Sequence, residues 1–358
     1  MVSITYSRQL AGIKKMSRLV SLVKQDDTYT SIYKSLDLIK DELTHRINHR
    51  KHILIKPNMT ATKNIYSNTN VGAIEAVLTF FKNKFKNFDK LEFTIEDGSG
   101  SAFYENTTTK SVFERFGYYE LENEFKNVKI LTLDDCRDFF EVPIKTAKGD
   151  GFVRVARHIN DYDYKISVTP IKTHNYAIAT LGIKNMLGYI KQEDKSLVHG
   201  LKLKGAPGKT IFDYIPTSII SKARRIMPSL VNIAFRMSPT YRQGVKLIHH
   251  NIASVAKEIY PDLVVLDCYY GMEGDGPIDG TRIYLGAAIA STDALKADGI
   301  GARLMGLNPE DIGYLKLLYD LGHGDYSLKG LVGRKISDVK QMFKLHTNYD
   351  LQKAWNKK

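Results

Sequence analysis

Apolar and polar positions along the first third of the chain predict helices and buried strands in alternation. Ile32, Leu36, Ile39, Leu43 and Ile47 recur at helical spacing, which predicts a helix over 29–47. The same criteria then indicate strand 52–55, helix 71–85, strand 91–95, helix 111–124 and strand 128–133. Since parallel strands are usually joined through helices, this order predicts an α/β fold with a mainly parallel twisted sheet flanked by helices.

The second half of the chain interrupts this rhythm and then resumes it. The pattern indicates a strand at 164–171, helical spacing at 179–190, and a basic, apolar helical stretch at 215–248 that is broken by prolines. From 251 onward it predicts a helix to 260, strand 263–266, a glycine-rich loop at 271–280, strand 282–289 and a helix from about 291. We therefore expect five segments: an N-terminal helical lead-in (1–50), a first α/β half (51–194), a basic insertion or lid (195–248), a second α/β part (249–329) and a basic C-terminal extension (330–358).

The positive charge of the chain is concentrated in one segment. The 358 residues carry a net charge of +13, and between Lys195 and Lys257 eleven Lys or Arg face a single acid, Asp213. A solvated basic face is the plain interpretation. An anionic ligand, an acidic membrane surface contacted through 215–248, and nucleic acid are the alternatives. Nucleic acid is not expected, because no recognition element accompanies the charge.

Composition excludes several classes of protein. Hydrophobic residues make up 43% of the chain and charged residues 25%, which is ordinary for a globular protein. No apolar run reaches the roughly 18 residues that a membrane span needs, and the start lacks the apolar core of a signal peptide. Cys136 and Cys268 are the only cysteines, so a disulfide scaffold and an intrinsic iron–sulfur cluster are not expected. We expect a cytoplasmic protein, with membrane association as the alternative.

Polar residues follow several predicted strands directly, where ligands bind in open α/β sheets. Lys56 and Asn58 flank Pro57 and can share one face, as a cation and an amide suited to a carboxylate or phosphate. After the next strand, Asp97, Gly98 and Ser99 could supply backbone amides to an anion, or a metal ligand. A surface lysine with a capping asparagine, and a simple turn, are the structural alternatives.

Two later segments carry the same kinds of residue. Lys172 and His174 directly follow the strand at 164–171, where the lysine suits an anion and the histidine can move a proton. Lys184 and Asn185 lie in a helix with two glycines, which cost stability unless something packs closely, and His199 follows in a glycine- and lysine-rich loop. A structural histidine and a helix–helix contact are the alternatives here.

Acidic residues gather near the strand at 263–266. Asp267 ends this strand, and Glu273, Gly274, Asp275 and Gly276 follow in the glycine-rich loop. Asp97, Glu273 and Asp275 are the candidate ligands of a divalent metal. The loop is neither a dinucleotide fingerprint nor an EF-hand, and the chain contains no P-loop, nucleophile elbow or H-E-x-x-H motif. A solvated loop is the alternative.

Taken in order, these segments resemble the domain of unknown function 362 family over about residues 50–307. The resemblance rests on the turns after the first two strands, on the later segments around Lys172 and Lys184, on His199 and on the loop that begins at Gly271. It implies the α/β fold and the site. Many relatives carry a ferredoxin-type domain that this chain lacks, so any iron–sulfur cluster would belong to a partner protein.

These residues favour an enzyme that acts on a small anionic substrate. Lys56, Asn58, Gly98, Ser99, Lys184, Asn185, His199, Gly274 and Gly276 would bind the carboxylate or phosphate. His174, Lys172 and Asp267 would carry the catalysis, by acid/base or metal-assisted isomerisation, elimination or group transfer. The alternatives are a non-catalytic cofactor-binding or accessory protein that works with a redox or iron–sulfur partner, and a peripheral membrane-surface binder.

Overall fold

A computed structural model describes residues 18–200, 223 and 226–357 of the chain. Its described residues form a nine-stranded mixed sheet in the order β11-β1-β10-β9-β7-β2-β3-β4, with β8 paired to β7. The pairs β9–β7, β7–β2, β2–β3 and β3–β4 are parallel, whereas β10 is antiparallel to both β1 and β9. The sheet is therefore mostly parallel at its centre, as the α/β prediction requires.

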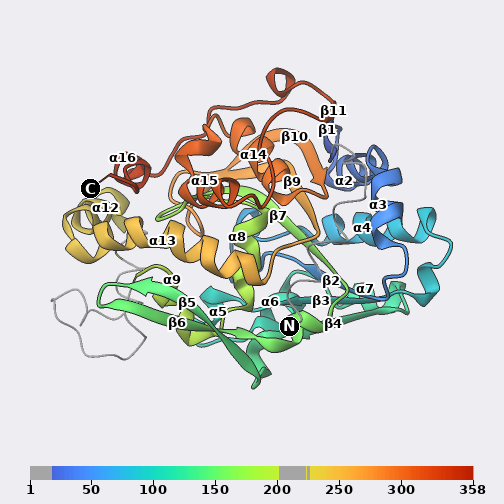
Figure 1. Ribbon diagram of the computed structural model, residues 1–358, viewed down its shortest axis with the longest axis horizontal. Helices are drawn as coiled ribbons and strands as arrows, with labels where there is room; N and C mark the ends of the chain where they lie inside the picture. The colour runs from blue at the N-terminus through green and yellow to red at the C-terminus, as the bar shows by residue number, and fades with distance from the viewer. Residues whose placement is uncertain (1–17, 201–222, 224–225, 358) are drawn as a thin grey trace.

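The strands of this sheet are β1 (Val20–Lys24), β2 (His52–Lys56), β3 (Glu92–Asp97), β4 (Val128–Thr132), β7 (Tyr164–His174), β8 (Ile178–Thr180), β9 (Leu263–Glu273), β10 (Thr281–Ser291) and β11 (Leu331–Gly333). A separate antiparallel hairpin consists of β5 (Phe139–Thr146) and β6 (Gly149–Ala156). In Figure 1 this hairpin lies at the lower left, below α9 and α13.

The described α-helices are α2 (Thr28–Asp37), α3 (Lys40–Ile47), α4 (Val71–Lys84), α5 (Gly100–Tyr104), α6 (Thr109–Arg115), α7 (Glu120–Glu124), α8 (Gly182–Asn185), α9 (Lys195–Val198), α12 (Pro228–Met237), α13 (Pro239–Glu258), α14 (Ala294–Leu304), α15 (Gly313–Asp320) and α16 (Tyr349–Lys353). Short 3-10 turns join them, among them η3 (Leu133–Asp135), η4 (Arg157–Asp161) and η5 (Met186–Tyr189).

The sheet separates two hydrophobic cores. Side chains alternate across each strand, so Val264 and Leu266 of β9 face one core while Leu263 and Val265 face the other. The first core is covered by α8, α13, α14 and α15 together with the β5–β6 hairpin, and the second by α2, α3, α4, α6 and α7 (Figure 1). Burial on both faces explains why the central strands read as continuous apolar runs.

The sequence pattern predicts which helices and strands exist better than it predicts where they begin and end. The expected helix at 29–47 is two helices, α2 and α3, and the expected helix at 111–124 is divided at Gly117, whose φ is +73°. The expected helical stretch 179–190 begins with strand β8 and is helical only from Gly182. The pattern does not indicate strands β1, β5 and β6, because they are short or polar on one side.

Part of the basic segment lies outside the described residues, namely 201–222 and 224–225. Its described end holds α12 and the 20-residue helix α13, which begins at the Ser238 cap with Pro239 as its first residue. None of the helices in the described ranges is long and apolar enough to cross a bilayer.

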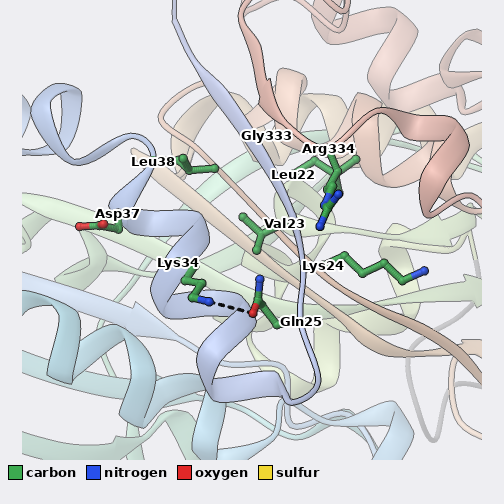
Figure 2. Close-up of a pocket in the computed structure, with 9 residues that line it drawn as sticks. All are labelled: Leu22, Val23, Lys24, Gln25, Lys34, Asp37, Leu38, Gly333 and Arg334. Atoms are coloured by element: carbon green, nitrogen blue, oxygen red, sulfur yellow. Dashed lines mark hydrogen bonds between the residues drawn. The ribbon is translucent and has the colours of Figure 1, made fainter.

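A shallow surface pocket of about 520 Å³ lies beside the edge strand β1. It is lined by Leu22, Val23, Lys24, Gln25, Lys34, Asp37, Leu38, Gly333 and Arg334 (Figure 2). Lys34 donates a hydrogen bond to Gln25 across it, at 2.8 Å. The lining includes none of the predicted site residues, and strands β10 and β9 separate β1 from β7.

Candidate functional site

Lys56 ends β2 and lies beside the end of the neighbouring strand β3. Its ammonium donates to Asp97 Oδ1 at 2.6 Å, to the Pro57 carbonyl at 2.9 Å and to Asn185 Oδ1 at 3.2 Å. Its side chain is 1% exposed and that of Asp97 is 4% exposed, so the pair is fully buried. Burial lowers the pKa of Lys56, and the charge of Asp97 opposes that shift. With three donors on three acceptors, this ammonium is satisfied by the protein itself.

Two amides continue the same network across the sheet. Asn185 accepts from Asn58 Nδ2 at 2.9 Å and donates to the Lys56 carbonyl and to Ser167 Oγ, both at 3.0 Å. The other oxygen of Asp97 accepts the backbone N–H of Met59 at 2.8 Å. Asn58 and Asn185 therefore tie β2, β7 and α8 together, and their amide groups are occupied by these bonds.

Lys172 is saturated in a similar way. Its ammonium is fully buried in β7 and donates to Asn58 Oδ1 at 2.7 Å and to the Ser67 carbonyl at 2.6 Å. Longer contacts reach the hydroxyls of Thr60 and Ser67. Burial, and next the charge of Lys184, lowers the pKa of Lys172 well below its usual range. We call Lys56, Asn58, Asp97, Lys172 and Asn185 the closed set.

Glycines allow the closed set to pack. A Cβ on Gly188 would lie 2.3 Å from Asp97 Oδ1 and 2.5 Å from Lys56 Cε, which no real side chain allows. Gly98 is similarly enclosed by Gln192 and Leu133, and its carbonyl accepts Lys195 Nζ at 2.6 Å. Ser99 caps α5, with its hydroxyl accepting from the Ala102 N–H. Gly98 and Ser99 thus have internal contacts of their own.

Lys184 differs from the other two lysines. It is partly buried in α8, and among the residues that the structure describes its Nζ has no hydrogen-bond or ion-pair partner. Burial, and then the charges of Lys195 and Lys56, lowers the pKa of Lys184 to about 7. Its charge in turn lowers the pKa of His174 and His199, which places it near both rings. An ammonium near half-protonation without a counter-ion is suited to an incoming anion.

The hydrogen bonds of His174 fix its tautomer. Nδ1 of this buried ring accepts the backbone N–H groups of Tyr176 at 3.0 Å and Ala177 at 3.1 Å. An atom that accepts two hydrogen bonds carries no proton, so the neutral ring has its proton on Nε2. Burial, followed by the charge of Lys184, lowers the pKa of His174 well below its usual range. His174 is therefore a neutral ring that presents an N–H donor.

His199 presents a hydrogen-bond acceptor, whereas His174 presents a donor. Its Nδ1 lies 2.9 Å from the Lys195 carbonyl, which can only accept, so Nδ1 carries the proton and Nε2 carries the lone pair. The ring stacks on His174 with centroids 5.6 Å apart and planes 14° apart. Burial, and next the charge of Lys184, lowers the pKa of His199 to about 4. In the described part of the chain both Nε2 atoms are unpartnered; we call Lys184, His174 and His199 the open set.

Asp267 is not joined to either set. It lies in β9 opposite Pro170 and Ala288, and its Oδ1 accepts the Tyr269 N–H at 3.0 Å. Burial raises the pKa of Asp267 to about 7. It has no hydrogen bond or ion pair with Lys56, Lys172 or His174. The helix predicted from about 291 is α14, which begins at Ala294 after its cap Asp293, whose side chain accepts the Lys296 N–H.

The acids of the glycine-rich loop have partners of other kinds. Glu273 accepts the Lys344 N–H at 2.7 Å, and Asp275 lies 3.6 Å from His346 Nε2. Gly274 accepts from the Thr173 hydroxyl, and Gly276 lies against the Thr173 backbone. No three His, Cys, Asp or Glu side chains of the described residues are grouped as metal ligands. The metal site assigned to Asp97, Glu273 and Asp275 stays a prediction.

Two residues near the site lie outside the predicted set. Lys195 follows no strand and belongs to the basic stretch, yet its Nζ binds the Gly98 carbonyl, and burial lowers its pKa to about 8. Asp298 lies within α14 and accepts the N–H groups of Gly182 and Ile183, which fixes the start of α8. Its place in an alanine-rich helix is the one local signal, because a buried carboxylate there needs such a partner.

The fold and the site define an α/β protein with a polar cluster at the carboxyl edge of a mostly parallel sheet. Residues 53–303 match the family described as "Domain of unknown function (DUF362)", and the chain belongs to this family. A search of curated proteins finds no match.

Among solved structures, the chain is similar to the lactate racemase apoprotein from Thermoanaerobacterium thermosaccharolyticum. The TM-score is 0.43 and the sequence identity 12%, over 81% of this chain and 57% of that chain. This chain therefore spans little more than half of the length of that protein.

Proposed function

We propose that this protein is an enzyme that binds a small carboxylate or phosphate at Lys184 and moves a proton within it. The proposal rests on one observation, the open set. Lys184, His174 and His199 have polar atoms without partners in the described residues, in a region where the closed set is fully satisfied. Polar atoms that the protein leaves without partners are the ones that an incoming ligand can contact, so the open set indicates a ligand site.

Lys184 would hold the anionic group of the substrate. Its pKa of about 7 means that an arriving carboxylate or phosphate stabilises the charged form and raises that pKa. The same negative charge offsets the field of Lys184 at His199, so the basicity of His199 also rises when the site is occupied. Substrate binding would thereby prepare the base.

The two histidines would divide the proton transfer between them. Nε2 of His199 has the lone pair and would take a proton from the carbon next to the anionic or carbonyl group, breaking the C–H bond. Nε2–H of His174 would donate to the oxygen on which negative charge develops, as a neutral imidazole can. Return of the proton gives isomerisation, and loss of a leaving group from the neighbouring carbon gives elimination.

Exchange of substrate hydrogen with solvent tests this function directly. We would incubate the protein in D₂O with a panel of 2-hydroxy, 2-oxo and 2-amino carboxylates and sugar phosphates, and follow deuterium incorporation by NMR. The expected result is enzyme-dependent exchange at one carbon, lost in His199→Gln and in Lys184→Met. The exposed variant His45→Gln is the matched control.

The same experiment separates an enzyme from an accessory protein. Tight binding of a panel member without exchange, unchanged in His199→Gln, would contradict the catalytic proposal. That result would support the non-catalytic alternative, in which the open set holds a cofactor for a redox or iron–sulfur partner.

A second candidate function is attachment to an anionic lipid surface through α12. Ile226 and Met227 just before α12, and Leu230, Ile233 and Met237 within it, recur at helical spacing, and each is between 50% and 72% exposed. The chain between Lys195 and Lys257 carries a strong excess of basic residues. Exposed apolar residues beside basic charge favour an anionic bilayer surface over a neutral protein partner.

Vesicle co-sedimentation tests the lipid proposal. The protein should sediment with phosphatidylserine-containing vesicles, less with phosphatidylcholine alone, and Leu230→Glu with Ile233→Glu should abolish sedimentation. Leu321→Glu, at a similarly exposed leucine that follows α15, is the control. Equal sedimentation of the double variant would contradict this candidate.

A further inference from the structure

Cys136, His158 and Glu96 contact one another in that order, on the opposite side of β3 from Asp97. Cys136 follows η3, His158 lies in η4, and Glu96 is the residue before Asp97 in β3. Nδ1 of His158 is 3.9 Å from Cys136 Sγ, and Nε2 of the same ring is 3.0 Å from both oxygens of Glu96. No sequence motif predicts this arrangement, because 22 residues separate Cys136 from His158 and 62 separate His158 from Glu96.

The hydrogen bonds around Glu96 orient the ring. Glu96 is 2% exposed and also accepts the hydroxyls of Tyr189 at 2.5 Å and Tyr162 at 3.3 Å. An ionised carboxylate only accepts, so Nε2 of His158 is the protonated nitrogen and the lone pair of Nδ1 faces the thiol. This is the arrangement in which an imidazole takes the proton of a nucleophile.

The thiol is within reach of solvent. Cys136 is partly buried and the His158 side chain is 33% exposed, whereas the other cysteine, Cys268, is fully buried in β9. The Cys136 thiol has a second acceptor, the Asp138 carbonyl at 3.3 Å. Burial raises the pKa of this thiol, so the proton is present at neutral pH and its removal needs a base.

We propose that Cys136 is a nucleophilic thiol, activated by His158 and Glu96, that forms mixed disulfides with small disulfides carrying carboxylates. Cys136 Sγ attacks one sulfur and the disulfide S–S bond breaks. The thiol proton passes to Nδ1 of His158, and the other half leaves as a thiolate that is then protonated. Cys136 is oxidised and the small disulfide is reduced, one thiol being released for each mixed disulfide formed.

Two observations favour a disulfide over an acyl group as the electrophile. Acyl transfer develops an oxyanion that needs N–H donors, whereas the groups close to Sγ are the Asp138 carbonyl and the acids Glu96 and Asp138. Exposed Arg137 is adjacent in sequence and contributes positive charge at the thiol, and exposed Arg157 pairs with Asp138 at 3.0 Å, so two cations beside the thiol suit a carboxylate on the small molecule. With Cys268 buried elsewhere, this chain supplies no resolving thiol, so the product is a stable mixed disulfide.

The test uses the full chain with oxidised glutathione as the probe. Peptide mass spectrometry should find glutathione on Cys136 and none on Cys268, which is the internal control. His158→Gln should slow modification at pH 7 by about 100-fold, as loss of a general base does. Glu96→Gln, which keeps the ring but weakens its orientation, should give an intermediate rate.

The pH profile distinguishes activation from simple exposure. Glu96 raises the pKa of His158, with Asp161 and Asp138 adding to the shift, so the wild-type rate should rise as His158 loses its proton. In His158→Gln the rise should move to the higher pH at which the thiol itself ionises. Equal rates in wild type and His158→Gln, or modification of Cys268 at a similar rate, would overturn the proposal. Should His158→Gln fail to fold by circular dichroism, the wild-type profile still decides, since a rise only above pH 9 would contradict it.

Discussion

The closed and open sets are neighbours at the same edge of the sheet, but they differ in whether the protein supplies hydrogen-bond acceptors to a buried lysine. Lys56 and Lys172 each donate to at least three oxygens of the protein, whereas Lys184 has no such acceptor in the described residues. Burial lowers the pKa of all three. The difference lies in the partners, which make two lysines structural and leave the third available to a ligand.

The two sets also differ from what residue type alone predicts. Lysines and amides that follow parallel strands are expected to bind an anion together. In the structure the closed set instead binds itself and holds β2, β3, β7 and α8 in register. The residues that remain available to a ligand lie beside it, in the open set of Lys184, His174 and His199.

The largest expected effect comes from opening the closed set. Lys56→Met leaves the carboxylate of Asp97 buried without its cation, and the free energy of unfolding should fall by about 4 kcal/mol. Urea unfolding checks this result. Lys84→Met removes an exposed ion pair with Asp37 and should have a far smaller effect. Equal effects of the two variants would show that the Lys56–Asp97 pair is no more than a surface ion pair.

A methyl group at Gly188 should damage the same pair by crowding it. Gly188→Ala places Cβ in the space of Asp97 Oδ1 and Lys56 Cε, and should cost about 2 kcal/mol of unfolding free energy. Gly100→Ala is the matched control, because an added Cβ there meets nothing within 4 Å. Thermal and urea unfolding of both variants would decide, and a harmless Gly188→Ala would show that the closed set is loosely packed.

Lys184 should make the free energy of unfolding depend on pH. Its pKa is about 7 in the folded chain and 10.5 when unfolded, so between these values the unfolded chain binds the additional proton. The free energy of unfolding therefore rises with pH across this window, by up to about 1.4 kcal/mol per pH unit from this group. Lys184→Met should lack this rise, and identical slopes for both proteins between pH 7 and 9 would contradict the assignment.

The two histidines should differ modestly in stability. His174→Gln leaves two backbone N–H groups without their acceptor and should cost about 1–2 kcal/mol. His199→Gln disturbs a single hydrogen bond, that to the Lys195 carbonyl, of a ring that is only partly buried, so its cost should stay below about 1 kcal/mol. Both should abolish solvent exchange. A larger stability loss in His199→Gln than in His174→Gln would reverse the hydrogen-bond roles of the two rings.

The sequence predicts the sheet and the position of the site. It does not predict which site residues belong to the closed set and which belong to the open set. The apolar runs around Ile55, Ile95 and Val265 predict parallel strands, because burial on both faces leaves a strong compositional signal. The rule that polar residues after such strands meet at one edge correctly brings Lys56, Asn58, Asp97 and Lys172 together. Which of them are saturated depends on distant residues such as Ser67 and Asn185, and no local pattern records those contacts.

Other features lack a local signal for related reasons. The tautomers of His174 and His199 are set by single backbone groups, and the pairing of Cys136 with His158 requires the three-dimensional fold. Asp267 follows a strand like the others, yet β9 continues past it to Glu273 and keeps it inside the sheet. A longer strand than the apolar run indicates is enough to remove a residue from the expected edge.

The most direct test of the division into closed and open sets is site-resolved acetylation of the native protein with sulfo-N-hydroxysuccinimide acetate between pH 6 and 9. Peptide mass spectrometry would give the rate at each lysine, with exposed Lys90 as the reference. We predict that Lys184 reacts with a rate that is half-maximal near pH 7, while Lys56 and Lys172 stay unmodified until the chain unfolds. A Lys184 as unreactive as Lys56, or one whose rate rises only above pH 9, would contradict this division.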